Sequence, residues 1–307
     1  MIFIYILLSI TFVYLLVTFI IYRVIFYRCD KPSKLVKINY TCEQRKVMND
    51  VKKEIYEKYK LSHEDVFVES FDNLKLFGKL YVLDEKKPIV ISFHGYRGNY
   101  KDNNLGIKKF VFDNNYNLLL VCQRSHYESE GKTITFGIKE RRDVAVWVKY
   151  ISDRFPNNKI ILAGTSMGAS TVLMASDLVM SKNVCGIIAD APFDSPLEVM
   201  YETIRRMKLP VKLVSILACN SGVLFGDFNI KYHTSLKSVK KTKLPILIIH
   251  GKNDNTISYK LSEELYKSNN KKVEYHLIDN ADHCASYFEN PKLYLDIISK
   301  FIKKVIK

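Results

Sequence analysis

A serine lies between two glycines in the run KIILAGTSMGASTVLMAS, residues 159–176. Ser166 is the central residue of a G-x-S-x-G motif framed by Gly164 and Gly168. A serine hydroxyl becomes a useful nucleophile when a base removes its proton, and histidine suits that task at neutral pH. A carboxylate must in turn hold the histidine in the right tautomer. The motif therefore indicates nucleophilic catalysis by Ser166 and calls for an acid and a histidine elsewhere in the chain.

Both partners follow in the order serine, acid, histidine, which is one of the orders known for this chemistry. Asp254 lies in IIHGKNDNTIS, after an apolar run that ends at His250, and His283 lies in LIDNADHCAS, after the next apolar run. If those runs are strands, both residues lie at carboxyl ends of strands, the edge where open α/β sheets bind ligands. The sequence therefore predicts a triad of Ser166, His283 and Asp254.

Other titratable residues near these motifs need an interpretation as well. Asp190 ends the apolar run VCGIIAD and is the alternative choice for the acid of the triad. His94 and His250 each precede a glycine and are interpreted as turn or core-edge residues rather than bases. Asp282 is expected at the surface, pointing away from the histidine that follows it. Cys284 lacks a base arrangement of its own and is expected to be a packed thiol.

The predicted nucleophile needs a sharp turn between a strand and a helix. Glycines at 164 and 168 would leave room for the backbone to bend and would expose the hydroxyl of Ser166 at the sheet edge. The helix would begin near Met167, and its free N–H groups favour the negative oxygen that forms when a carbonyl is attacked. We therefore expect the backbone N–H of Met167 to donate to that oxyanion.

The scaffold for these residues is expected to be an α/β fold. Continuous apolar runs alternate with amphipathic helical patterns, which indicates a mostly parallel sheet with helices on both faces. An antiparallel hairpin is expected over residues 65–83. Six strands are expected, at residues 88–95, 116–122, 159–164, 184–190, 244–251 and 272–279. Each is followed by a helix, at residues 100–113, 138–155, 167–181, 258–268 and 291–306, except that the strand at 184–190 is followed by a less regular stretch at 195–240.

Residues 1–22 contain no charged side chain and would form a helix of roughly 33 Å, long enough to cross a bilayer. The run is too long for the usual apolar core of a signal peptide, and no small-residue cleavage site follows it. We therefore predict a transmembrane anchor with a basic flank at residues 1–28. The positive-inside rule then puts the body of the protein in the cytoplasm. The cations just after the apolar run are Arg23, Arg28, Lys31, Lys34 and Lys37.

The rest of the chain divides into a connecting segment and one domain. A linker containing Pro32 and an amphipathic helix at 43–60 occupy residues 29–60, and residues 61–307 form the α/β domain. An apolar, proline-containing stretch at about 191–243 is interpreted as a small helical lid over the catalytic edge. Such a lid would provide an apolar wall and exclude water from the site.

Composition excludes several other classes of protein. A hydrophobic content of 48% over 307 residues excludes a disordered chain. The net charge is +15. The lysines are spread among acids without a nucleic-acid-binding motif, so attraction of the body to an anionic leaflet explains the charge better than nucleic acid does. The six cysteines show no CxxC pair and are expected to be free thiols, which agrees with a cytoplasmic location. Neither a metal nor an organic cofactor is expected.

Five motifs together resemble those of the α/β-hydrolases, and more closely those of bacterial membrane-anchored serine hydrolases of the acyl-esterase and prolyl-oligopeptidase-like branch. They are HGYRGN (94–99), GTSMGAS (164–170), DAPFDS (190–195), HGKND (250–254) and DNADH (279–283). The resemblance implies that the backbone N–H of Tyr96 is the second oxyanion donor. The chain departs from the family pattern D-x-R-x-H-G-x-S-x-G at residues 122–131, where Cys122 replaces the aspartate and Tyr127 replaces a glycine.

These observations predict a serine hydrolase that cleaves an ester or thioester of a small acyl compound through an acyl-enzyme. A serine peptidase of the prolyl-oligopeptidase type, acting on peptide-like substrates, is the first alternative. The chain contains no β-propeller sequence ahead of the domain, which disfavours that alternative. A non-catalytic scaffold tethered to the membrane is the second alternative, and the serine, acid, histidine order argues against it.

Overall fold

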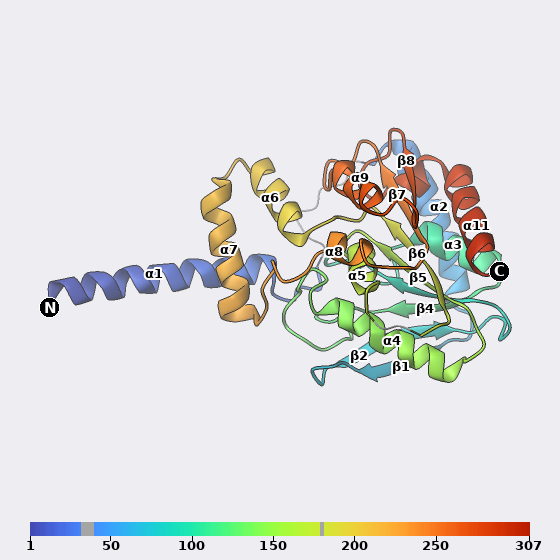
Figure 1. Cartoon of the computed structure of the whole chain (residues 1–307), viewed down its shortest axis with the longest axis horizontal. Coiled ribbons are helices and arrows are strands. Elements are labelled where there is room, and N and C mark those ends of the chain that lie inside the picture. Colours follow the sequence, from blue (N-terminus) through green and yellow to red (C-terminus); the bar gives the residue numbers. More distant parts are fainter. Residues whose placement is uncertain (32–39, 179–180) are drawn as a thin grey trace.

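The computed structural model of the protein describes residues 1–31, 40–178 and 181–307, and a sheet of eight strands forms its centre (Figure 1). The order across the sheet is β1-β2-β4-β3-β5-β6-β7-β8. Strands β1 and β2 form an antiparallel hairpin, β2 is also antiparallel to β4, and all other neighbours are parallel. The strands are β1 (Glu64–Glu69), β2 (Lys75–Tyr81), β3 (Ile89–Phe93), β4 (Asn117–Val121), β5 (Ile160–Thr165), β6 (Val184–Asp190), β7 (Ile246–Gly251) and β8 (Val273–Ile278).

The apolar runs become strands because both faces of the sheet are covered. Every residue of β3, β4, β5 and β7 is buried, so alternate side chains enter two separate cores. Helices α2 (Cys42–Lys58), α3 (Leu105–Asp113), α10 (Ser286–Glu289) and α11 (Pro291–Val305) contribute to one core. Helices α4 (Glu140–Arg154), α5 (Met167–Ala175) and α9 (Tyr259–Ser268) contribute to the other. The mostly parallel sheet with helices on both faces is confirmed.

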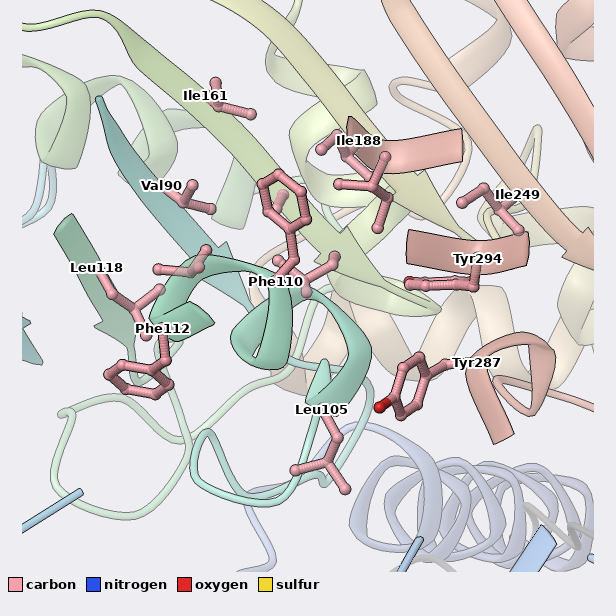
Figure 2. Close-up of a cluster of buried hydrophobic side chains, with 14 of the residues drawn as sticks. Val90, Leu105, Phe110, Phe112, Leu118, Ile161, Ile188, Ile249, Tyr287 and Tyr294 are labelled. Atoms are coloured by element: carbon pink, nitrogen blue, oxygen red, sulfur yellow. The ribbon is translucent and has the colours of Figure 1, made fainter. Parts of the chain in front are cut away.

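The first core shows how the fold positions the catalytic edge. Figure 2 shows Phe110 and Phe112 of α3 over Val90 and Leu118 of the central strands, with Tyr294 of α11 beside Ile249. All of these residues are buried. The packing fixes the strands whose carboxyl ends carry the loops predicted to hold the functional residues.

Helix α1 (Ile2–Ile25) is long and apolar enough to be a candidate membrane span. It ends at Ile25 instead of residue 22, and most of its length projects away from the body (Figure 1). Its C-terminal end is packed, with Tyr22 and Phe26 buried. The ring of Phe26 makes edge contacts with Phe136 at 5.9 Å and Phe228 at 5.0 Å between centroids. These long-range contacts, absent from the sequence-based interpretation, join the helix to the body.

The stretch expected to be less regular contains three helices: α6 (Pro196–Arg206), α7 (Val211–Gly226) and α8 (Ser235–Val239). Its prolines start helices instead of breaking them. Pro196 is the first residue of α6 behind the cap Ser195, and Pro210 is the N-terminal cap of α7. Helix α7 crosses α1 (Figure 1), with the rings of Phe19 and Phe225 5.3 Å apart.

The segment between α1 and α2 is described only in part. Thr41 caps α2 by accepting from the backbone N–H of Gln44, and the Gln44 side chain accepts from the backbone N–H of Thr41. This helix occupies the place expected for the amphipathic connector. The predicted linker residue Pro32 and the cations Lys34 and Lys37 lie outside the described residues.

Candidate active site

Ser166 occupies the turn between β5 and α5 with φ 55° and ψ −120°, a conformation that L-residues rarely adopt. The flanking glycines are required by close approach of backbones. A Cβ on Gly164 would lie 2.4 Å from the carbonyl carbon of Gly168, and a Cβ on Gly168 would lie 2.3 Å from the oxygen of Phe93. Because no side chain fits at either position, the two glycines allow the sharp turn that presents Ser166.

The three residues predicted to form a triad lie together, on the loops after β5, β7 and β8. The Ser166 hydroxyl lies 3.0 Å from Nε2 of His283. Nδ1 of His283 lies 2.7 Å from Oδ2 of Asp254. In the tautomer that this carboxylate favours, Nδ1 carries the proton and Nε2 is free to accept one from the serine. The arrangement can therefore move a proton away from Ser166.

The carboxylate of Asp254 is held at both oxygens. Oδ1 accepts from the backbone N–H groups of Thr256 and Ile257 at 2.8 and 2.7 Å, and Oδ2 also accepts from Nε2 of His250 at 3.1 Å. Burial acts to raise the pKa of Asp254, but the charge of His283 and the side-chain hydrogen bonds with His250 and His283 outweigh burial and hold the pKa below its usual range. Asp254 is therefore ionised in the folded protein at neutral pH.

The contact between His250 and Asp254 was missed by sequence reasoning, which interpreted His250 only as a turn or core-edge residue. The two residues are four apart, and their meeting depends on the conformation of the loop after β7. The spacing H-G-x-x-D is the one signal that could have suggested it. His94 is buried as expected, with Nε2 accepting from the backbone N–H of Gln123 at 3.0 Å.

The charge of Asp254 favours the imidazolium that forms when His283 takes a proton. Burial acts to lower the pKa of His283, but the charge of Asp254 and the contacts with Asp254 and Cys284 together outweigh burial and raise the pKa well above the usual value. Burial raises the pKa of the adjacent Cys284 thiol to about 11, so this thiol is neutral and contributes no negative charge. Cys284 is only half-buried, so it is less completely packed than expected.

Asp190, the alternative acid, lies at the end of β6 but makes no hydrogen bond to His283 among the described residues. Its Oδ2 accepts from the hydroxyl of Tyr294 at 2.8 Å, and its backbone oxygen accepts from the N–H of Ser166 at 2.8 Å. Burial raises the pKa of Asp190 to about 6. Asp190 therefore supports the turn at Ser166 through its backbone, whereas Asp254 contacts the histidine.

The expectation that Asp282 lies at the surface is wrong. The residue is buried, and its Oδ1 accepts from the backbone N–H groups of His283 at 2.7 Å and Asn255 at 3.0 Å. A carboxylate satisfied by two backbone donors is stable inside the protein. Asp282 thus links the loop that carries the histidine to the loop that carries Asp254.

The predicted oxyanion donors lie on either side of Ser166. Met167 begins α5, and Tyr96 follows β3 in a loop where a Cβ on Gly95 would lie 3.4 Å from the Cβ of Ser166. Among the described residues, no hydrogen bond uses the backbone N–H of Tyr96 or Met167. Two free N–H groups beside a nucleophile can donate hydrogen bonds to a developing negative oxygen.

The loop after β3 is clamped to the end of α1. The hydroxyl of Tyr96 donates to the backbone oxygen of Ile25 at 2.6 Å, and its ring stacks on Phe136 at 4.9 Å. The guanidinium of Arg97 donates to the backbone oxygen of Val24 at 2.7 Å and to that of Tyr27 at 3.2 Å. One predicted oxyanion donor is therefore positioned by residues that touch the membrane-span candidate.

The departures at Cys122 and Tyr127 are accommodated within one loop. Cys122 is buried and its thiol donates to the backbone oxygen of His126 at 3.1 Å. Tyr127, which replaces a glycine of the pattern, has φ 35°, the side of the φ range that glycine favours. Nε2 of His126 accepts from the backbone N–H of Arg97 at 3.1 Å. The loop thus retains a direct contact with the segment that follows β3.

Two cavities of opposite character meet at Ser166. One has a volume of about 240 Å³ and apolar walls from α1, α6 and α7, among them Ile21, Val24, Ile25, Val199, Met200 and Val214. The other, of about 480 Å³, is called here the polar cavity; its lining is mixed, because Met48, Leu105 and Phe288 line it together with the charged and polar residues Arg45, Lys52, Arg97, Asp102, Asn103 and His283. An extended ligand can therefore place an apolar part on one side of the serine and a polar part on the other.

Comparisons with known proteins connect the chain to bacterial relatives and to solved esterases. No protein-family profile matches the chain. Protein YqkD of Bacillus subtilis is 27% identical over 215 residues, which cover 69% of this chain and 70% of YqkD. The esterase Pf2001 of Pyrococcus furiosus superimposes with a TM-score of 0.66 at 24% identity, covering 89% of this chain and 97% of the esterase. Est1E of Butyrivibrio proteoclasticus, solved with ferulic acid bound, gives a TM-score of 0.59 at 20% identity and covers 78% of this chain and 99% of Est1E.

Proposed function

We propose that this chain, which has the α/β-hydrolase fold, is a serine hydrolase that cleaves esters or thioesters of apolar acyl groups. The observation that carries the proposal is the hydrogen-bonded line from Ser166 through His283 to Asp254, at 3.0 and 2.7 Å. The esterases that share the fold support the reaction class. In this proposal Ser166 is the nucleophile, His283 the base and Asp254 the residue that orients the base.

The proposed reaction has two steps. His283 takes the proton of Ser166 at Nε2 while Oγ attacks the carbonyl carbon, and the carbonyl oxygen becomes an oxyanion. His283 then gives that proton to the departing alkoxide or thiolate, leaving an acyl ester on Ser166. A water molecule, deprotonated by His283, attacks this ester, and the proton returns to Ser166 as the carboxylic acid departs.

The oxyanion is assigned to the backbone N–H groups of Tyr96 and Met167. Their freedom from other hydrogen bonds among the described residues supports this assignment. One such donor is typically worth about 3 kcal/mol of barrier in comparable hydrolases. The clamp of Tyr96 on Ile25 fixes the first donor in place before substrate arrives.

The two cavities suggest how a substrate lies in the site. The acyl chain is assigned to the apolar cavity, whose walls offer almost no hydrogen-bonding partner. The leaving group is assigned to the polar cavity, where Arg45 and Arg97 favour a polar group, while Lys52 pairs with Asp102 at 3.7 Å. The substrate class proposed is therefore an amphiphilic ester with one apolar chain and a polar alcohol or thiol component.

We place α1 across the membrane and the body in the cytoplasm, because cations follow α1 closely. The packing of Tyr22 and Phe26 against the body supports retention of α1 in the working protein. Cys42 is exposed and reports on orientation. We expect an impermeant thiol reagent to label Cys42 in lysed cells but not in intact ones, and labelling in intact cells would contradict the cytoplasmic location.

Labelling of the detergent-solubilised full chain with a fluorophosphonate tests the nucleophile. We expect the wild type to be labelled and Ser166→Ala to be unlabelled, with circular dichroism showing that both are folded. Ser170→Ala is the matched control, because Ser170 lies one turn along α5 and contacts the backbone of Phe193 instead of the histidine. Labelling that persists in Ser166→Ala, or folded wild type that neither labels nor hydrolyses esters, would contradict the proposed function.

A further inference from the structure

Helix α7 exposes a row of large apolar side chains that no described part of the protein covers. Their exposed fractions lie between 49% and 57%, and their separations of three, seven and one positions place them on one face of the helix. An apolar face of this kind on a soluble surface usually marks an interaction site. The four residues of this face, called here the α7 face, are Leu213, Ile216, Val223 and Leu224.

The length of α1 indicates what covers the α7 face. About 20 helical residues are needed to cross a hydrocarbon core of about 30 Å. Helix α7 contacts α1 already at Tyr14, whose hydroxyl accepts from the Asn220 side chain at 2.7 Å, and again at Phe19 and Tyr22 through Phe225. Residues 2–13, which lie beyond these contacts, rise only about 18 Å. If α1 spans the bilayer, α7 must lie at the depth of the hydrocarbon.

The charges around α7 agree with that position. Residues 203–226 contain no acidic side chain. Arg205, Arg206, Lys208 and Lys212 are all exposed beside the start of α7. Long basic side chains of this kind reach from an apolar level to anionic lipid headgroups.

The apolar cavity opens beside α1 and the start of α7. Ile20 and Val24 of α1 and Met207 and Leu209 of the turn before α7 line the cavity and are also exposed at the surface. These four residues therefore form its rim. An apolar rim that faced water would favour collapse of the opening, whereas one that faces acyl chains is stable.

We propose that the α7 face is embedded in the acyl-chain region of an anionic phospholipid leaflet, and that the cavity rim opens into that leaflet. Resting on the proposed function, this assigns the substrate class: an ester resident in the membrane, whose apolar chain enters the cavity sideways between α1 and the turn before α7. Its polar part then lies in the polar cavity, toward the headgroups and water. The membrane helix is thus one wall of the binding site as well as a tether.

Depth-dependent fluorescence quenching tests the position of α7 independently of catalysis. The full chain is reconstituted in vesicles of phosphatidylcholine and phosphatidylglycerol whose acyl chains carry bromine. The native Trp147 is fully buried and also emits, so the emission of the wild-type protein is measured first and subtracted as background. We expect Ile216→Trp to add emission that bromine quenches almost completely and aqueous acrylamide hardly affects. Tyr56→Trp, at an exposed position on α2, should show the opposite pattern. Ile216→Trp emission quenched by acrylamide and not by bromine would overturn the proposal.

A second experiment separates membrane docking from chemistry. In the double variant Ile216→Glu with Val223→Glu, neither residue lines the apolar cavity. We expect fluorophosphonate labelling and hydrolysis of a short water-soluble ester to match the wild type, while hydrolysis of a long-chain ester held in vesicles falls at least about tenfold. Tyr56→Glu, the matched control, should retain both activities. Wild-type hydrolysis of the vesicle-held ester by the double variant would overturn the docking proposal, whereas loss of all labelling in the wild type would overturn the proposed function.

Discussion

Replacing Asp254 with asparagine tests the site most directly, because the substitution keeps the shape of the side chain and removes its charge. The amide oxygen can retain the two bonds from Thr256 and Ile257 at Oδ1. The amide NH₂ then occupies the position of Oδ2, where it meets the nitrogens of His283 and His250. Since a donor cannot accept from Nδ1–H, His283 is driven to the tautomer that carries its proton on Nε2, and it can no longer accept the proton of Ser166.

The size of the effect follows from that change of tautomer. In serine hydrolases with this arrangement, the corresponding substitution lowers kcat about 10⁴-fold. That is about 5 kcal/mol of barrier. The substitution also removes the charge that raises the pKa of His283, so the acid limb of the pH profile must move to lower pH. In the wild type the base form appears only as pH rises through that raised pKa, so its acid limb lies above the ordinary histidine value.

The assay is hydrolysis of a chromogenic ester by the full chain in detergent, measured as kcat/KM across the pH range in which the fold persists. Asp190→Asn is the matched control, because Asp190 is also a buried aspartate at the end of a strand, but bonds Tyr294. We expect Asp190→Asn to lose less than about tenfold, the scale of one neutral hydrogen bond. A fall of less than tenfold in Asp254→Asn, or an unmoved acid limb, would refute the reasoning, and the reverse ranking of the two variants would make Asp190 the acid.

Three further predictions concern the integrity of the fold, and chemical unfolding of the full chain in detergent measures the first two. Phe26→Ala removes a fully buried ring that joins α1 to the body and should lower the free energy of unfolding by about 3–5 kcal/mol, while Phe26→Leu should cost less. Arg124→Met leaves the buried carboxylate of Asp143 without its partner at 2.6 Å and should cost about 3–5 kcal/mol, and a change below 1 kcal/mol would contradict this. Gly168→Ala should fail to fold or lose fluorophosphonate labelling, because its Cβ would lie 2.3 Å from the oxygen of Phe93.

Much of the fold was predictable because its signals are local. The continuous apolar runs, such as residues 246–251, become strands buried on both faces. The G-x-S-x-G motif identifies its own turn, since the glycines are needed by backbone contacts within a few residues and with the neighbouring strand. The predictions of Asp254 and His283 relied on the order of serine, acid and histidine along the chain and on their places after apolar runs, because the carboxyl ends of parallel strands share one edge of the sheet.

The parts that were missed depend on contacts between residues far apart in the sequence. The clamp of Tyr96 on Ile25 joins residues separated by 71 positions, and no local pattern indicates it. The helical lid was expected, but the bounds of α7 and its crossing of α1 were not, because that crossing joins residues about 200 positions apart, such as Asn220 and Tyr14. The burial of Asp282 depends on two backbone N–H groups that converge only after the loops beyond β7 and β8 have folded.

The clamp between α1 and the loop after β3 has a mechanical consequence. A spanning helix adjusts its tilt when its apolar length and the thickness of the bilayer differ. In this chain the end of α1 bears Val24 and Ile25, which form one wall of the apolar cavity and hold Arg97 and Tyr96. If α1 spans the membrane and the cavity holds the acyl chain, as proposed, a thinner or thicker membrane would reshape the cavity and shift the acyl length that fits it. Bilayer thickness would then influence which substrate is hydrolysed fastest. The preferred acyl-chain length would differ between vesicles made from short-chain lipids and vesicles made from long-chain lipids.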